Sequence, residues 1–158
     1  MVSVFVDTSA LYAVLDRDDE NHSRASEAFA ELLPDTTLLT HSYVVVEATA
    51  LVQRRLGVDA VRVLVDDVLP AIELVFVDES LHRAGTAALL ASAARDVSLV
   101  DWTSFELMRK EGVATAFAFD EDFARHGFQL RFPPSGPHTR PALNRQRPTP
   151  INTSAIGV

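Results

Sequence analysis

Cysteine is absent from the 158-residue sequence, and its absence excludes several kinds of site. Disulfide frameworks, thiolate zinc centres and cysteine nucleophiles all require that side chain. Long apolar runs are missing as well, because the N-terminal run stops at Asp7 and no basic segment precedes it. We therefore expect a cytoplasmic protein with no signal peptide and no membrane span.

Positive charge is also scarce: 14 Lys and Arg stand against 22 Asp and Glu, which gives a formal net charge of −8. Phosphate contacts normally come from clustered Lys and Arg, so this balance is unusual for a protein that binds nucleic acid. The charge is unevenly placed, because no acidic residue follows Phe123. A body this acidic either repels nucleic acid or gathers carboxylates around cations.

Apolar, β-favouring runs alternate with helical patterns along the chain, and no hairpin signal separates them. This order predicts one α/β domain with a parallel sheet that helices cover on both faces. Strands are expected at residues 2–6, 38–39, 73–77, 113–119 and 128–132. Helices are expected after a Ser9 cap and at residues 22–33, 42–56, 59–69, 78–94 and 98–112, with a helical turn at 122–126.

The composition changes after Phe132. Six of the 8 prolines lie in residues 133–158, together with several Arg, Thr and Asn, and the segment has no helical or strand periodicity. We expect residues 1–132 to form the domain and residues 133–158 to be a disordered or loosely docked tail. A basic arm that contacts RNA or a partner is the alternative.

Four carboxylates come from separate segments of the predicted fold. Asp7 and Asp120 directly follow apolar strands, at the edge where parallel sheets bind ligands. Asp101 lies in the first turn of the helix that Ser98 opens, and Glu47 lies among valines on the helix at 42–56.

Each of these residues also has a purely structural interpretation. Asp7 and Asp120 are also typical helix caps, as is Asp122, and Asp101 forms a capping box with Ser98. Glu47 is different, since a charged residue in an apolar stretch is rarely buried without a partner, and no Lys or Arg lies one turn away.

Taken together, the carboxylates would repel one another at close range unless a cation neutralised them. An all-oxygen ligand set favours Mg2+ or Mn2+. The histidines show no metal-ligand spacing and are expected to be solvated or structural; they are His22, His41, His82, His126 and His138.

Four segments carry a resemblance to a known family. They are Val-Phe-Val-Asp7-Thr8-Ser9-Ala10-Leu11, the helical Glu47, Ser98-Leu99-Val100-Asp101-Trp102-Thr103-Ser104-Phe105, and Ala118-Phe119-Asp120-Glu121-Asp122-Phe123. In this order they resemble the signature segments of PIN-domain proteins, and most closely those of VapC-type toxins, over about residues 1–132. The Pro-rich extension departs from that pattern.

The resemblance implies a three-layer α/β/α domain, Mg2+-dependent cleavage of single-stranded RNA, and a small antitoxin that blocks the site. Asp7 and Asp101 would be the principal metal ligands, and Glu47 and Asp120 would complete the acidic site. Asp122 could replace Asp120. Supporting or RNA-contacting hydroxyls would come from Thr8, Ser9, and Thr103 or Ser104. We also expect a homodimer.

A metal held in this way would orient and deprotonate a water for in-line attack on a phosphodiester, leaving 5′-phosphate and 3′-hydroxyl ends. Further attraction to RNA is expected from basic residues on nearby helices, although they could equally be solvated helix ends. These residues are Arg54, Arg55, Arg109, Lys110 and Arg125.

Three alternatives remain open. A haloacid-dehalogenase-like phosphatase needs a second Asp two residues after Asp7, where this chain has Ser9. A receiver domain needs an acidic pair at the first strand and a Lys at a late strand end, whereas the only Lys, Lys110, lies on a predicted helix. The third is a PIN-like RNA-binding or RNA-processing protein without a toxin role.

Overall fold

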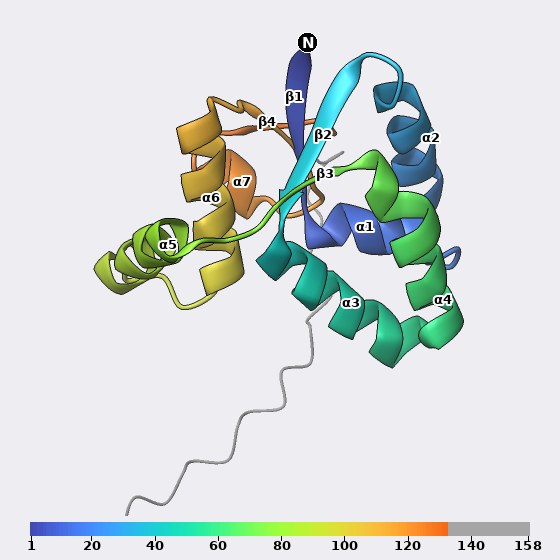
Figure 1. Cartoon of the computed structure of the whole chain (residues 1–158), viewed down its shortest axis with the longest axis horizontal. Helices are drawn as coiled ribbons and strands as arrows, with labels where there is room; N and C mark the ends of the chain where they lie inside the picture. Colours follow the sequence, from blue (N-terminus) through green and yellow to red (C-terminus); the bar gives the residue numbers. More distant parts are fainter. Residues whose placement is uncertain (133–158) are drawn as a thin grey trace, which may run out of the picture.

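A computed structural model describes residues 1–132, and the segment expected to be a tail lies outside the described residues. The described part is a five-stranded sheet with helices on both sides (Figure 1). The strand order is β3-β2-β1-β4-β5, and all four pairings are parallel. The predicted α/β fold with a parallel sheet is confirmed.

The elements alternate along the chain much as the sequence pattern predicts. The strands are β1 (Val2–Val6), β2 (Thr36–His41), β3 (Glu73–Val75), β4 (Thr115–Phe117) and β5 (Gln129–Leu130). The helices are α1 (Thr8–Leu15), α2 (His22–Leu32), α3 (Ser42–Leu56), α4 (Val58–Val63), α5 (Glu79–Ala91), α6 (Leu99–Glu111) and α7 (Asp122–Arg125). A π-helical turn η1 (Leu64–Val68) and a 3-10 turn η2 (Leu69–Ala71) follow α4.

Strand β1 occupies the middle of the sheet. Val4, Phe5 and Val6 are all buried, because the strand has neighbours on both edges and packed side chains on both faces. This explains why its sequence is continuously apolar rather than alternating. The carboxyl end of β1 therefore opens directly onto the edge of the sheet where Asp7 lies.

The helices form two groups on either side of β1 and β2. In Figure 1, α1 to α4 lie on one side, and α5, α6 and α7 lie on the other. Within the second group α5 packs closely on α6: a Cβ added to Gly85 would lie 2.5 Å from the Thr103 hydroxyl oxygen. Across residues 1–132, no helix has the length and apolar character needed to cross a membrane.

The helix predicted over residues 59–69 is present but irregular. It continues from α4 into η1, where the Leu69 N–H donates to the Leu64 carbonyl, and then into η2, which contains Pro70. The wider π turn allows Leu64 and Val68 both to be buried in the core. Pro70 lies at the start of the 3-10 turn, where its missing N–H removes no helical hydrogen bond.

Candidate active site

Asp7 is the first carboxylate at the carboxyl edge of the sheet. Its N–H donates to the Phe117 carbonyl at 3.1 Å, which extends the β1–β4 pairing by one residue. Its Oδ2 accepts hydrogen bonds from the Ser9 N–H at 3.1 Å and from the Ser9 hydroxyl at 2.6 Å. Asp7 therefore caps α1, in place of the Ser9 cap expected from the sequence, and the capping interpretation of Asp7 holds.

The carboxyl group of Asp7 is only 5% exposed, and its surroundings make ionisation unfavourable. Burial and, to a smaller extent, the negative charges of Asp101 and Asp120 raise its pKa to about 7, despite the hydrogen bonds from Ser9 that lower it. A charge effect of this kind requires proximity. Asp101 on α6 and Asp120 after β4 are thus near enough to influence the ionisation of Asp7, which follows β1.

Asp101, like Asp7, both takes part in a helix cap and has a raised pKa. The Ser98 N–H and hydroxyl both donate to its Oδ2 at 2.8 Å, and its own N–H donates to the Ser98 hydroxyl, so the predicted capping box is confirmed. Burial raises the pKa of Asp101, and the charges of Asp120 and Asp122 add to that effect. Within residues 1–132 neither Asp7 nor Asp101 forms an ion pair.

Glu47 reaches the site from a different environment than expected. Its side chain is exposed, because Val44 and Ala48 occupy the face of α3 that packs on the core. The expectation that burial would force Glu47 to find a partner was therefore wrong. It nevertheless accepts a hydrogen bond from the Thr8 hydroxyl at 2.8 Å, which places it beside the residue that follows Asp7.

Asp120 and Asp122 differ in their partners. The Asp120 carboxylate accepts from the Asp122 N–H at 2.9 Å, and its charge acts on both Asp7 and Asp101. Asp122 is 2% exposed and forms an ion pair with Arg125 at 2.8 Å. The geometry therefore favours Asp120 over Asp122 as the fourth member of the acidic site.

The four predicted hydroxyls divide into two pairs. Thr8 contacts Glu47, and Ser9 contacts Asp7 while accepting the Phe119 N–H at 3.0 Å. Thr103 and Ser104 are fully buried, and each donates to the carbonyl one turn earlier on α6. Direct contact of Thr103 or Ser104 with RNA, one of the two roles expected for them, does not fit this placement.

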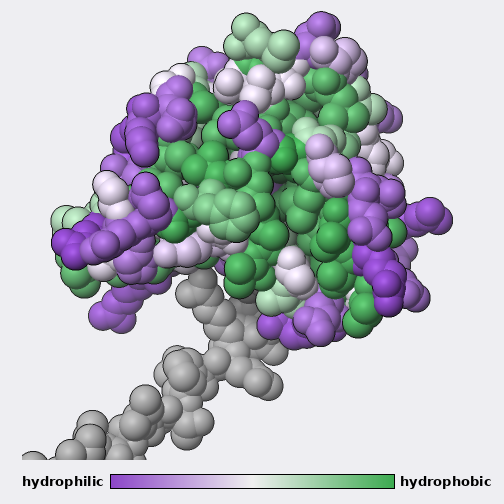
Figure 2. All heavy atoms as spheres, in the orientation of Figure 1, coloured by the Kyte–Doolittle hydropathy of each residue, from purple (hydrophilic) through white to green (hydrophobic). Residues whose placement is uncertain are grey.

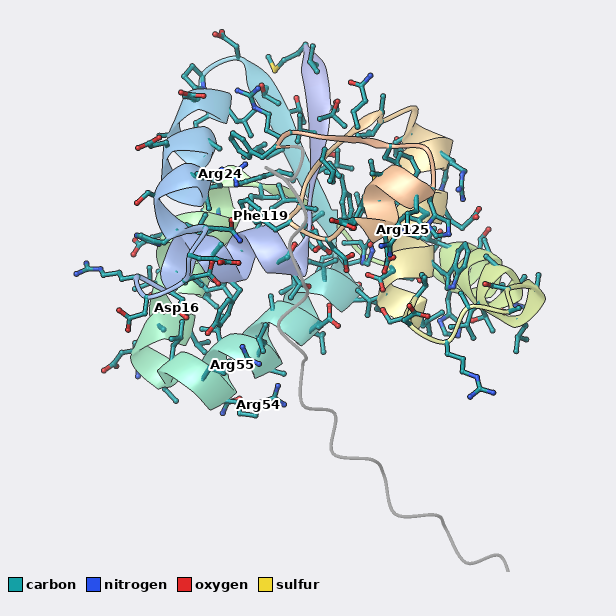
Figure 3. All side chains as sticks on the ribbon, turned by 180° about the vertical axis from the view of Figure 1, so that it is seen from behind. Asp16, Arg24, Arg54, Arg55, Phe119 and Arg125 are labelled. Atoms are coloured by element: carbon teal, nitrogen blue, oxygen red, sulfur yellow. The ribbon has the colours of Figure 1, made fainter. Side chains whose placement is uncertain are left out.

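Two of the five basic residues predicted to attract RNA already form ion pairs. Arg109 pairs with Glu106, and Arg125 pairs with Glu121 as well as Asp122. Arg54, Arg55 and Lys110 are exposed and make no ion pair within the part of the chain that the structure describes, and Figure 3 shows Arg54 and Arg55 at the end of α3. Of the predicted set, Arg54 and Lys110 remain available to a phosphate backbone, whereas Arg55 contacts Tyr12, with its Cζ 5.6 Å from the ring centroid.

His41, expected only to be solvated or structural, links two of the helices that carry the carboxylates. Its Nε2 lies 2.8 Å from the Ser104 hydroxyl, and its Nδ1 accepts the Val44 N–H at 3.3 Å. Burial lowers its pKa to about 4, so the ring is neutral near pH 7. It therefore fixes the start of α3, which bears Glu47, against α6, which bears Asp101.

The donor set fits a hard divalent cation. Within residues 1–132 no three Asp, Glu or His side chains are already grouped as ligands of a metal ion. Within the described residues no Lys or Arg pairs with Asp7 or Asp101, whose pKa values are raised, and carboxylate oxygens are the ligands that Mg2+ and Mn2+ prefer. Such an ion would draw the carboxylates together by replacing their repulsion with attraction.

Comparisons with known proteins agree with this geometry. The sequence profile of the PIN domain matches residues 4–129. The 23S rRNA-specific endonuclease VapC20 of Mycobacterium tuberculosis is 33% identical over 126 residues, which cover 79% of this chain and 95% of that protein. Its crystal structure, described as a Sarcin-Ricin loop cleaving toxin, matches with a TM-score of 0.69 at 32% identity, again over 79% of this chain and 95% of that one.

More distant structures share the fold. VapBC2 from Rickettsia felis, bound to a DNA fragment from its promoter, matches with a TM-score of 0.62 over 82% of this chain and 97% of that one. The identity is 13%, so this likeness concerns the arrangement of the backbone alone.

Proposed function

Since this chain belongs to the PIN domain family, we propose that it is a Mg2+-dependent endoribonuclease and the toxin of a type II toxin–antitoxin pair. The observation that carries the proposal is the convergence of Asp7, Asp101 and Asp120 at the carboxyl edge of the sheet. It occurs in a chain that is 33% identical to an endonuclease over nearly the whole length of that enzyme. Neither a phosphatase nor a receiver domain finds support in these comparisons.

Asp7 and Asp101 would hold the metal, and Asp120 and Glu47 would complete the acidic site. Bound there, Mg2+ or Mn2+ supplies a Lewis acid for activating water and for offsetting charge on the phosphate. The hydrogen bonds from Ser9 hold the Asp7 carboxylate in one orientation, and the Thr8 hydroxyl does the same for Glu47. Because Asp7 has a pKa of about 7, a metal held by its carboxylate would compete with a proton near neutral pH.

The substrate is RNA, and ribosomal RNA is the first to test because the relative from M. tuberculosis is specific for 23S rRNA. The site of action would be the cytoplasm. The protein partner we propose is a small antitoxin that blocks the carboxylate edge, as the similarity to VapC-type toxins suggests.

We also propose that the chain forms a homodimer. Figure 2 shows hydrophobic residues gathered in the middle of one face, over β3 and the segment that follows it. Phe76 is 76% exposed there and Leu74 is 38% exposed, and a second copy of the chain would remove both from water. The mass of the purified protein in solution tests this proposal.

Cleavage of purified ribosomal RNA tests the activity. Mg2+ or Mn2+ should support it and EDTA should abolish it. Asp7→Asn and Asp101→Asn should each remove nearly all cleavage, whereas Asp66→Asn, which alters an exposed carboxylate in η1, should cleave like the wild type. Undiminished cleavage in EDTA, or products with 2′,3′-cyclic ends, would rule out a metal-activated water.

Overexpression tests the toxin role separately. The wild type should arrest growth and the Asp7→Asn protein should not, and a small protein should co-purify with either one. If both proteins are equally tolerated, the toxin role is lost while the nuclease activity can stand.

A further inference from the structure

Arg24 on α2 differs from the other cations of the domain. It is half-buried, whereas every other Lys and Arg in residues 1–132 is exposed. Among these residues it forms no ion pair, and no hydrogen bond from its guanidinium is present, although the chain contains 22 acidic residues. Partly buried charges are normally paired, so an unpaired one in so acidic a protein requires an explanation.

The Arg24 guanidinium contacts two aromatic rings instead of a carboxylate. The Arg24 Cζ lies 5.2 Å from the centroid of Phe132 and 5.9 Å from that of Phe119. The two rings are nearly parallel, with centroids 6.3 Å apart and an interplanar angle of 6°. Ring faces attract a guanidinium through its charge but accept few of its N–H groups, so most of its five donors remain available to a ligand.

This cluster of Arg24, Phe119 and Phe132 lies next to the carboxylates. Figure 3 shows Arg24 beside Phe119, and Asp120 is the residue after Phe119. The Phe119 N–H donates to the Ser9 hydroxyl, which in turn donates to Asp7. A chain of two hydrogen bonds therefore fixes the cluster relative to the carboxylate that we assign to the metal.

We propose that Arg24 binds a backbone phosphate of the RNA beside the one that is cleaved. This inference rests on the proposed nuclease function, because it needs an RNA strand crossing the carboxylate edge. A planar guanidinium with free N–H donors matches phosphate oxygens, and its aromatic support keeps it in place before RNA binds. The contact also offers local attraction in a domain whose net charge would otherwise repel the strand.

The test measures how salt weakens the binding of a fluorescein-labelled single-stranded RNA oligonucleotide, in an Asp101→Asn background that prevents cleavage. Removing one phosphate contact lowers the slope of log K against log salt concentration by about 0.7 for single strands. Arg24→Gln should show this loss of slope and about a tenfold loss of affinity at low salt. Arg24→Lys keeps a point charge and should recover most of the slope.

The matched control is Arg83→Gln. Arg83 is exposed on α5 and already paired with Glu79, so its replacement removes the same formal charge without removing a phosphate contact. The slope of log K against log salt concentration for Arg83→Gln should equal that of the Asp101→Asn parent. Melting curves of all variants show whether each is folded. If Arg24→Gln does not fold, Arg24→Met removes the same charge while keeping an unbranched apolar stem between the rings, and it should show the same loss of slope.

The possible failures are distinguishable. If the wild type cleaves RNA but Arg24→Gln matches its parent in slope and affinity, the assignment of Arg24 is wrong and the nuclease function stands. If the wild type neither cleaves nor binds RNA, both proposals fail. If Arg24→Gln binds RNA normally but loses the co-purifying antitoxin, Arg24 serves the protein partner, and our inference is overturned.

Discussion

Replacing Asp7 with asparagine should stabilise the metal-free protein, and the pKa of Asp7 sets the size of the gain. Burial raises that pKa from 3.8 to about 7. At 1.36 kcal/mol for each pKa unit, ionised Asp7 costs the folded state about 4 kcal/mol relative to the unfolded chain. Asparagine removes the charge and keeps an oxygen that can accept from Ser9, so the cap of α1 survives.

The sign of the pH dependence follows from the two pKa values. Below pH 3.8 the carboxyl is protonated in both states, and wild type and Asp7→Asn should be about equally stable. Between pH 3.8 and about 7 the unfolded chain loses its proton first, so the wild type becomes less stable as the pH rises. Above about pH 7 the advantage of Asp7→Asn should stay constant.

Thermal denaturation in EDTA, repeated from pH 4 to pH 8, measures this difference. At pH 8 the melting temperature of Asp7→Asn should exceed that of the wild type by an amount on the order of 10 °C for a domain of this size. Saturating Mg2+ should narrow this difference, since at a hundredfold excess over its dissociation constant it stabilises the protein that binds it by about 2.7 kcal/mol, which offsets more than half of the cost of ionised Asp7. A stability difference that does not change with pH would refute the reasoning, as would equal effects of Mg2+ on both proteins.

Two other substitutions test contacts away from the carboxylates. Burial lowers the pKa of His41 from 6.5 to about 4. The contribution of the neutral ring to the free energy of unfolding is therefore present above pH 6.5 and lost as the pH falls toward 4. Over that range the stability advantage of the wild type over His41→Gln should shrink by about 3 kcal/mol. A difference in unfolding free energy between the two proteins that stays constant across that pH range would contradict this prediction. Gly85→Ala should destabilise by about 1–3 kcal/mol, although alanine favours helices, because its Cβ would lie 2.5 Å from the Thr103 hydroxyl oxygen. Thermal melts measure this effect, which a Thr103→Ala background should reduce but not remove, because the backbone Cα and N of residue 103 would still lie 3.2 and 3.3 Å from the added Cβ.

The fold was predictable because the strands can be recognised from short apolar runs of neighbouring residues. The apolar run before Asp7 and the one before Asp120 both end at the carboxyl edge, so two site residues could be placed from adjacent residues alone. Asp101 was predictable from its spacing to Ser98, which is also local. Asp7 and Asp101 each take part in a helix cap and also have a raised pKa, so capping and the proposed acidic site do not exclude each other at these two positions. The expected cap at Asp120 or Asp122 was wrong, because Glu121 holds the N-cap position of α7 and its side chain makes no capping hydrogen bond.

What sequence reasoning missed depends on contacts between distant segments. Glu47 was expected to be buried, yet the face of α3 that packs inward is set by the sheet and by α1, and that face leaves Glu47 exposed. Thr103 and Ser104 face inward because α6 is covered on several sides, and their hydroxyls are satisfied by their own helix. The sequence of α2 does not predict that Arg24 contacts the rings of Phe119 and Phe132, which lie about a hundred residues later in the chain.

The central position of β1 also has a consequence for synthesis on the ribosome. β1 is translated first, but its pairing with β4 joins Val4 to Thr115, so one of its edges stays open until nearly all of the domain has left the exit tunnel. Closing so long a loop is also among the slower steps in folding. The acidic edge cannot be complete before that pairing forms, so the carboxylates that follow β1 and β4 come together only late in the folding of the domain.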